Sequence, residues 1–240
     1  MKRNTLAMRI WRGSIVLIVC TYLLLPIYSM LDFSTKPFAN VGSRTLRAWK
    51  VIPKEPELGS AITISLLIAF VVMTLVFVMV VPTVIWVHLK LPKLRRILEL
   101  ICLLPLAIPA IVIVVGIAPV YRWLSIHVTE SPITLSGVYT MLILPYTYRA
   151  LSSALSAIDI STLAEAAKTL GASTFRMIFG VVMPTIRSGI MSGAVISLAL
   201  VLGEYTISSL LSYHTLQVVI FQIGLDDGNV AVAVSLASLI

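Results

Sequence analysis

Residues that could do chemistry are sparse in this chain, and the most ordered group of them lies between residues 162 and 184. Glu165-Ala166-Ala167 is followed by Gly171 and then by Val181-Val182-Met183-Pro184. A short amphipathic helix with alanines lets a partner's backbone approach closely, which favours docking of the helix in a protein groove. The stretch lies between two apolar runs of membrane length, so we expect this docking at a membrane surface.

Enzyme chemistry finds no support in the rest of the sequence. It contains no G-x-x-x-x-G-K-[ST] run that would cradle ATP phosphates, no G-x-S-x-G and no H-E-x-x-H. The histidines His88, His127 and His214 are far apart, and Cys20 and Cys102 lie in apolar runs without metal-ligand spacing. We therefore predict no catalytic residues and no metal site, and any energy from ATP must come from another chain.

Glu204 is the carboxylate that we expect to lie at membrane depth, because it follows Arg187 by about 25 Å of helix. Ionisable residues at that depth are costly and usually face a cavity or a partner. The sequence leaves open whether Glu204 lines a solute path, lies among outer headgroups or pairs with an arginine of a second subunit. Tyr139, Tyr146 and Tyr205 are weaker path candidates, since tyrosines at the ends of crossings also form interfacial belts.

Composition places most of the chain in lipid or in a buried interior. Hydrophobic residues make up 59% of the 240 residues, charged residues 12%, and the mean hydropathy is +1.03. Because one helical crossing takes about 20 residues, we predict a single all-α integral membrane domain over residues 1–240, a bundle of about six transmembrane helices. The net charge of +8 does not indicate nucleic acid, since the basic residues lie beside apolar runs.

Apolar runs give the expected positions of these helices. The first run has a basic start but no small-residue cleavage site after it, so we interpret it as a retained anchor rather than a signal peptide. Gly189-x-x-x-Gly193 gives the fifth run a small face for close helix packing. The sixth run stops at Ile240 after about 20 Å of helix, against a hydrocarbon core of about 30 Å, so we expect it to be truncated. The expected crossings are 13–31, 61–81 with an extension to His88, 98–120, 133–149, 186–211 and a sixth from about Val230.

Lysine and arginine residues indicate which side of the membrane each loop faces. With the N-terminus in the cytoplasm, most of the 18 basic residues lie inside, Lys2, Lys90 and Lys168 among them, while the first outer loop keeps a smaller basic group. We therefore predict a cytoplasmic N-terminus and a cytoplasmic loop over residues 150–186.

The signals in this loop predict two short helices. Thr162 and Glu165 match a capping box at a helix start, and Gly171 suits the left-handed position after the helix end. A second helix is expected from Thr174 to Val182, stopping at Pro184. The alternative is that Glu165 only caps the helix and that the alanines reflect only helix propensity. The expected apolar surface comprises Leu163, Ala166, Ala167, Leu170, Phe175 and Phe179.

Glu165-Ala166-Ala167-x-x-x-Gly171, followed by nine residues and Val181-x-Met183-Pro184, resembles the EAA loop of binding-protein-dependent ABC importer permeases. Val181 and Met183 are conservative departures from the family pattern Ile-x-Leu-Pro, and Ser161 stands where many members have proline. The likeness extends over the whole chain and is strongest from Tyr146 to Thr215.

This resemblance implies a division of labour among several chains. The loop would be a coupling helix in a groove of a separate ABC ATPase dimer, which would bind ATP and Mg, with no cofactor in this chain. A second permease subunit, similar or identical, would complete the solute path, and an extracytoplasmic binding protein would deliver the solute at a prokaryotic inner membrane. The residues carried over to the coupling role are Glu165, Ala166, Ala167, Leu170, Gly171 and Pro184.

The solute is less clearly indicated. The stretches 202–206 and 215–222 are similar to spermidine/putrescine-type permeases, and Glu204 with Asp226 and Asp227 also favours a cation such as a polyamine. Iron, phosphonate and thiamine permeases of the same branch are alternatives. Two other classes stay open: an ion-coupled carrier, which would need membrane acids for ion relay and an inverted repeat, and a scaffold that transports nothing.

Overall fold

A computed structural model describes residues 3–37 and 43–239, and in these ranges the chain forms helices and turns without a strand. The all-α fold expected from the sequence is therefore confirmed. The chain divides into two compact units, one made of the residues up to Gly59 together with those from Val219 onward, the other of Ser60–Val218. Lys2 and Ile240, which entered the predicted orientation and the predicted sixth crossing, lie outside the described residues.

The first unit contains α1 (Arg3–Ser34), α2 (Arg47–Val51) and α14 (Gly228–Ala237). Asp227 caps α14 by accepting hydrogen bonds from the backbone N–H groups of Asn229 and Val230, and its other carboxylate oxygen lies 2.6 Å from the Arg47 guanidinium. The charge of Asp227 is thus already neutralised within the chain. It therefore gives less support to a cationic solute than its sequence position indicated.

The expected sixth crossing begins earlier than Val230. A helix, α13, already forms at Leu216–Asp226, and the helical path is interrupted at Asp227 before α14 starts. The side chain of Asp227 explains this interruption. Its carboxylate accepts hydrogen bonds from the free N–H groups of Asn229 and Val230, so a new helix starts after Asp227.

The second unit is built around a long, nearly continuous helix. α3 (Leu58–Leu75) passes through a π-helical turn, η3 (Val76–Val80), into α4 (Val81–Lys90). Pro82 lies directly after this π-helical turn, and the helical path continues past it. The extension of the second crossing past Pro82 to His88 is therefore confirmed.

The third expected crossing, 98–120, is wrong as a single helix. α5 (Arg95–Leu103) ends in a 3-10 turn, η5 (Leu104–Ala107), and α6 (Ala110–His127) starts afresh. Ile108 is extended, with φ −104° and ψ 119°, because the ring of the following Pro109 disfavours helical backbone at the preceding residue. The prolines of this run therefore break the helix.

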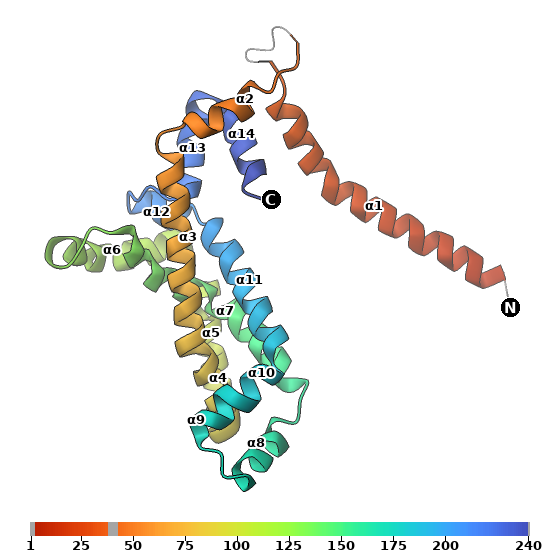
Figure 1. Ribbon diagram of the computed structural model, residues 1–240, viewed down its shortest axis with the longest axis vertical. Coiled ribbons are helices and arrows are strands. Elements are labelled where there is room, and N and C mark those ends of the chain that lie inside the picture. Colours follow the sequence, from red (N-terminus) through yellow and green to blue (C-terminus); the bar gives the residue numbers. More distant parts are fainter. Residues whose placement is uncertain (1–2, 38–42, 240) are drawn as a thin grey trace. The chain divides into compact units, whose positions relative to one another are not determined.

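α7 (Leu135–Ser156) and α11 (Arg187–Leu202) form the centre of the second unit (Figure 1). Tyr148 and Leu151 of α7 are completely buried there. The fifth expected crossing, 186–211, is interrupted: α11 ends at Leu202, and a short helix, α12 (Thr206–Leu210), follows after Gly203.

Among the described residues, four helical stretches are long and apolar enough to cross a membrane. α7, the helix expected over 133–149, is not one of them, because it carries many hydroxyl-bearing side chains in the bundle interior. The four stretches are Met8–Ser34, Leu58–Lys90, Ala110–His127 and Arg187–Leu210.

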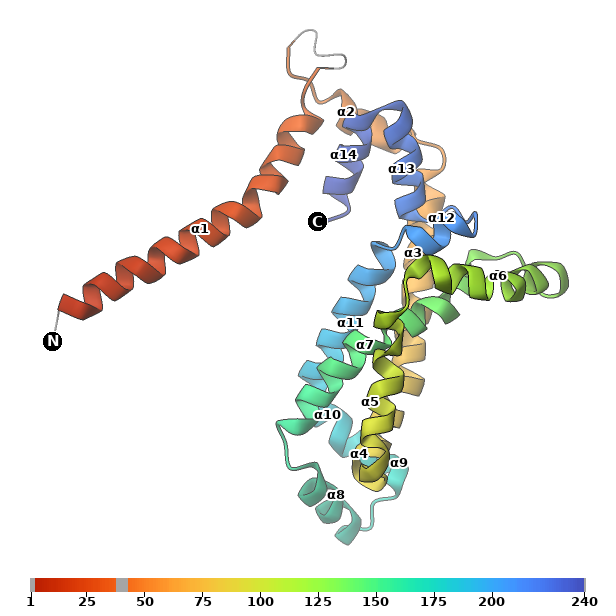
Figure 2. The same ribbon diagram turned by 180° about the vertical axis from the view of Figure 1, so that it is seen from behind.

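The segment between α7 and α11 lies at one end of the second unit. It comprises α8 (Ile160–Thr169), α9 (Thr174–Met177), a π-helical turn η7 (Ile178–Val182) and α10 (Met183–Thr185). Both views place α8 and α9 together with the end of α4, far from α6 and α12 (Figure 2). We call this region the α8 end.

Candidate functional site

Asp159 caps the start of α8. The predicted capping box of Thr162 and Glu165 is therefore wrong. The Asp159 carboxylate accepts hydrogen bonds from the Ser161 hydroxyl (2.7 Å), the Thr162 hydroxyl (2.6 Å) and the Thr162 backbone N–H (3.2 Å). These hydrogen bonds from Ser161 and Thr162 lower the pKa of Asp159 to about 2. The helix cap thus lies three residues earlier than expected, and Glu165 is released from a capping role.

The end of α8 is a Schellman turn centred on Gly171. Gly171 has φ +78°, its N–H donates to the Lys168 carbonyl (2.9 Å), and the Ala172 N–H donates to the Ala167 carbonyl (3.0 Å). A side chain at position 171 would meet no neighbouring atom within 4 Å. Glycine is therefore favoured here by its backbone conformation, as the sequence indicated, and not by lack of space.

The prediction that the second helix of the loop stops at Pro184 is wrong. Pro184 lies in the first turn of α10, where proline is tolerated, and the helical path runs on to Thr185 before α11 begins at Arg187. Pro184 itself lines an apolar groove with Phe77 and Arg187. Pro184 thus faces η3 and α11.

Burial divides the α8–α9 pair into an inner and an outer face. Ala164 and Ala167 are buried in the chain's own core, whereas Leu170 is 87% exposed and Phe175 is 70% exposed. Ala167, expected on the surface offered to a partner, therefore anchors α8 instead. Four side chains of α8 and α9 that the sequence analysis assigned to the partner-facing surface are exposed: Glu165, Ala166, Leu170 and Phe175. We call these four residues the docking surface.

Phe175 keeps its position on the docking surface by packing against another ring. Its centroid lies 4.4 Å from that of Phe179, with the two ring planes tilted by 31°. Such aromatic pairs contribute about 0.5–1.5 kcal/mol beyond the area they bury. The Phe175 ring is thus preorganised, and together with Leu170 it offers exposed apolar side chains that suit docking into a protein groove.

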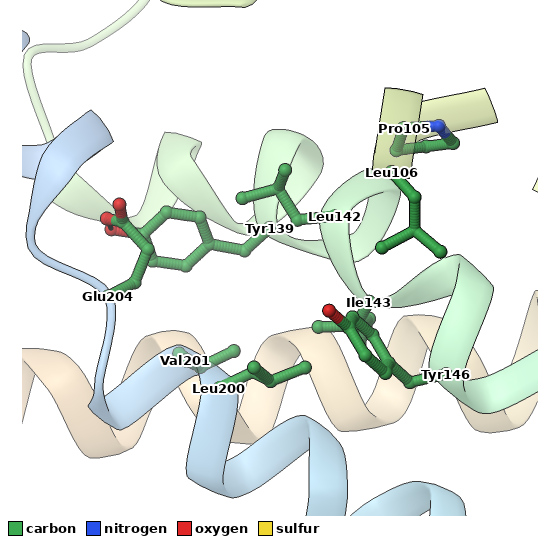
Figure 3. Close-up of a pocket in the computed structure, with 9 residues that line it drawn as sticks. All are labelled: Pro105, Leu106, Tyr139, Leu142, Ile143, Tyr146, Leu200, Val201 and Glu204. Carbon is green, nitrogen blue, oxygen red and sulfur yellow. Dashed lines mark hydrogen bonds between the residues drawn. The ribbon is translucent and has the colours of Figure 1, made fainter. Parts of the chain in front are cut away.

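A pocket that is open on one side lies between α7, η5 and α11 in the second unit (Figure 3). Tyr139 and Tyr146 enter it from α7, and Glu204 enters it from the break between α11 and α12. Three of the four predicted path residues therefore meet in one pocket, while Tyr205 is not among its lining residues. The other walls are apolar: Pro105, Leu106, Leu142, Ile143, Leu200 and Val201.

Glu204 holds the break between α11 and α12 in place. Its Oε1 accepts from the Ile207 N–H (2.7 Å), and its Oε2 accepts from the Tyr139 hydroxyl (2.6 Å) and the Ser208 N–H (3.2 Å). The carboxylate thus caps α12 and ties it to α7. No lysine or arginine lies within 4 Å of it in the part of the chain that the structure describes, so its negative charge has no cationic partner there.

Buried hydroxyl groups lie beside Glu204, and the backbone of Leu216 connects this group to Ser65 of α3. The Thr215 hydroxyl donates to Ser208 Oγ (2.9 Å), and the Leu216 N–H donates to Ser65 Oγ (2.8 Å). Ser65, Ser208 and Thr215 are each less than 5% exposed. These residues did not emerge from the sequence, where the signal available was a serine or threonine inside an apolar run, which also occurs in ordinary helix packing.

Comparisons with known proteins agree with this architecture. Residues 85–240 match the family described as "Binding-protein-dependent transport system inner membrane component". The chain also has a fold similar to that of a bacterial ABC transporter involved in the import of the acidic polysaccharide alginate, with a TM-score of 0.70, 14% identity and coverage of 99% of this chain and 93% of that one.

Two curated relatives match parts of the chain. A probable sulfate transport system permease protein, cysT, from Chlorokybus atmophyticus is 34% identical over 122 residues, which cover 46% of this chain and 42% of the relative. The spermidine/putrescine transport system permease protein PotB from Haemophilus influenzae is 36% identical over 83 residues, which cover 35% of this chain and 28% of the relative. The matches thus span less than half the length of either relative.

The family is one of transporter membrane subunits rather than of enzymes, in agreement with the absence of nucleotide-binding and hydrolase motifs from the sequence. The family match covers well over half of the chain and includes both the docking surface and the Glu204 pocket. The chain therefore belongs to the family of inner membrane components of binding-protein-dependent transport systems.

Proposed function

We propose that this chain is a permease subunit of an ATP-driven ABC importer. It forms half of a solute path and pairs with a second, similar or identical subunit. An extracytoplasmic binding protein delivers the solute, and an ATPase dimer that binds ATP and Mg drives the change between outward-open and inward-open states. The N-terminus and the 150–186 loop lie in the cytoplasm of a prokaryotic cell.

The docking surface carries this proposal. Leu170 and Phe175 are exposed apolar side chains on a rigid helix pair whose inner face is packed into the bundle. Exposed apolar side chains on a rigid frame favour burial against a partner, in the manner of a helix in a groove. The same α8 is joined through a short turn to α7, which lines the Glu204 pocket, so movement of the docked helix reaches the solute path.

For the solute we favour a small cation of the polyamine type. The support is the carboxylate of Glu204 in a pocket with two tyrosines, a combination that attracts an ammonium group by charge and by its contact with aromatic rings. One relative is described as a spermidine/putrescine permease and another as a sulfate permease, so both kinds of solute belong in the test.

Uptake by the assembled transporter in proteoliposomes tests this function. Labelled putrescine is offered with its binding protein and ATP inside the vesicles, in competition with sulfate, iron, phosphonate and thiamine. We expect ATP-dependent putrescine uptake that unlabelled spermidine competes with and sulfate does not. Uptake of sulfate in place of putrescine would overturn the cation assignment, and uptake without any ATPase would overturn the importer itself.

A further inference from the structure

The Glu204 carboxylate already accepts hydrogen bonds from its own chain on both oxygens. Its Oε2 accepts from the Tyr139 hydroxyl at 2.6 Å and from the Ser208 N–H at 3.2 Å, and its Oε1 accepts from the Ile207 N–H at 2.7 Å. An ionised carboxylate offers about four acceptor positions, shared equally between its two oxygens. Within the described ranges of the chain, Oε2 is therefore fully used, and the position that remains is on Oε1.

The hydroxyl of Ser208 does not take the remaining position on Oε1. It lies 3.4 Å from Glu204 Oε2 and 3.1 Å from the Tyr205 carbonyl, which is the nearer acceptor for its single proton. The same Ser208 oxygen accepts from the Thr215 hydroxyl at 2.9 Å. Because the only contact of this hydroxyl with the carboxylate is on Oε2, Oε1 keeps one acceptor position for a ligand.

The three donors are held in place by the fold. Two of them are backbone N–H groups in the first turn of α12, where no carbonyl of the same helix can accept from them. The third, the Tyr139 hydroxyl, comes from a side chain of α7 that is only 2% exposed. A ligand that displaced any of these donors would leave it buried without an acceptor, which is costly.

One free position on a single oxygen suits an ammonium group better than a guanidinium group. An ammonium is a compact charge that can donate to one oxygen, whereas a guanidinium binds a carboxylate most strongly by donating to both oxygens in parallel. That arrangement needs a position on Oε2, which the Tyr139 hydroxyl and the Ser208 N–H occupy. Without these donors, a carboxylate beside two tyrosines would favour guanidinium, because this group also stacks on aromatic rings.

We propose that the Tyr139 hydroxyl makes the Glu204 pocket selective for a primary ammonium group over a guanidinium group. The Tyr139 ring and the Glu204 carboxylate lie side by side in the pocket, so the hydroxyl acts where the charge of a solute would bind (Figure 3). The apolar walls suit the alkyl chain that carries the ammonium. The proposal rests on the proposed function, in which a cation occupies this pocket, and adds the residue that decides between cations.

The test measures binding to the assembled transporter in nanodiscs without its binding protein, so that the pocket alone selects the ligand. Leu200→Cys places a thiol in the pocket wall of a chain whose Cys20 and Cys102 have been replaced by serine, and a bound ligand protects this thiol from alkylation. The probes are butylammonium, butylguanidinium and butyltrimethylammonium. They share one positive charge and one alkyl chain but differ in their hydrogen-bond donors, of which the trimethyl compound has none.

We expect butylammonium to protect the thiol at about tenfold lower concentration than either other probe, because one charge-assisted hydrogen bond is worth about that factor. Tyr139→Phe keeps the ring and frees a position on Oε2, so protection by butylguanidinium should improve about tenfold and the preference for ammonium should disappear. Tyr146→Phe is the matched control. It removes a hydroxyl from the same pocket that makes no hydrogen bond to Glu204 in the described structure, so the preference should stay as it was.

Equal protection by butylammonium and butylguanidinium in the chain that retains Tyr139 would overturn the selectivity. This comparison needs no change at position 139, so it decides the question even if Tyr139→Phe folds poorly. A preference that a folded Tyr139→Phe leaves intact would also overturn the role of the hydroxyl. These failures differ from failure of the proposed cationic solute, in which none of the three probes would protect the thiol.

Discussion

Gly189 of α11 lies against Ala154 of α7 so closely that a methyl group at position 189 would be 2.5 Å from the Ala154 side chain and 3.0 Å from the Ala150 carbonyl oxygen. One turn along, a methyl group at Gly193 would lie 3.4 Å from the Thr147 side chain, which is an ordinary contact distance. The predicted small face of the fifth crossing is thus the surface on which α11 meets α7. Because α7 continues toward α8 and α11 follows α10, this contact joins the two ends of the docking segment.

Gly189→Ala should destabilise the permease by about 1–3 kcal/mol, because the backbone of α7 cannot yield without opening the helix contact. The measurement is thermal or denaturant unfolding of the purified protein in detergent. Gly116→Ala in α6 is the matched control, since its new methyl group would meet nothing within 4 Å and alanine is the better helix former. Equal melting temperatures for the two variants would show that α7 and α11 do not pack as described.

Gly171→Ala should weaken coupling more than Gly171→Asn does. At φ +78° an alanine side chain costs about 1 kcal/mol, whereas asparagine tolerates this left-handed conformation better. Both variants leave the space around position 171 open, so backbone strain is the property being compared. The readout is solute uptake per ATP hydrolysed in proteoliposomes. A ranking in which alanine is the better tolerated would contradict the Schellman turn.

The capping of α8 by Asp159 should make the start of this helix sensitive to acid. The folded-state pKa of about 2 lies below the ordinary value of 3.8, so the cap contributes stability above pH 3.8 and loses it as the pH falls toward 2. Amide exchange of Thr162 and Leu163, corrected for the intrinsic rate at each pH, measures the loss. Asp159→Asn keeps a capping oxygen without the titration, so its protection should not vary in this window. Parallel curves for both proteins would refute the charged cap.

Glu204→Gln should separate the charge of the pocket from its architecture. Glutamine keeps an acceptor for the Ile207 N–H, and its amide can donate to the Tyr139 hydroxyl, but it cannot accept from the Ser208 N–H. We therefore expect a modest fall in melting temperature, of about one hydrogen bond, and a large fall in uptake of a cationic solute. Tyr139→Phe removes the hydroxyl that donates to Glu204 and should cost about 1–3 kcal/mol of stability. Undiminished putrescine uptake by Glu204→Gln would exclude this carboxylate from solute recognition.

Local sequence signals predicted the features that one or two residues determine. Gly171 was placed correctly because only the left-handed region suits the turn that follows α8, and the Gly189 face was recognised from its spacing. The proline-containing run near Pro109 was assigned to one crossing, because apolar character alone does not separate a kinked helix from a broken one. The extended backbone of Ile108 decides between them.

The pocket could be predicted only in part. Glu204 was singled out by its cost in a membrane, but its bonds to Tyr139 and Ser208 depend on how α7 meets the break after α11, which no spacing rule encodes. The start of α8 was misplaced for a related reason. Asp159 and Thr162 are both acceptable caps, and in the structure Asp159 takes this role while Thr162 donates two hydrogen bonds to it.

The most direct test of the account is cross-linking from the docking surface. Leu170→Cys is introduced into a chain whose Cys20 and Cys102 have been replaced by serine, and a short bifunctional reagent is added to the assembled transporter in native membranes. The account predicts a covalent product between this chain and a P-loop ATPase, with a yield that changes when ATP is bound. It predicts no such product from Glu130→Cys, because this residue lies in the turn after α6 and not in the α8 end. A Leu170→Cys chain that reacts only with reagents applied from outside the cell, or that never reaches an ATPase, would contradict it.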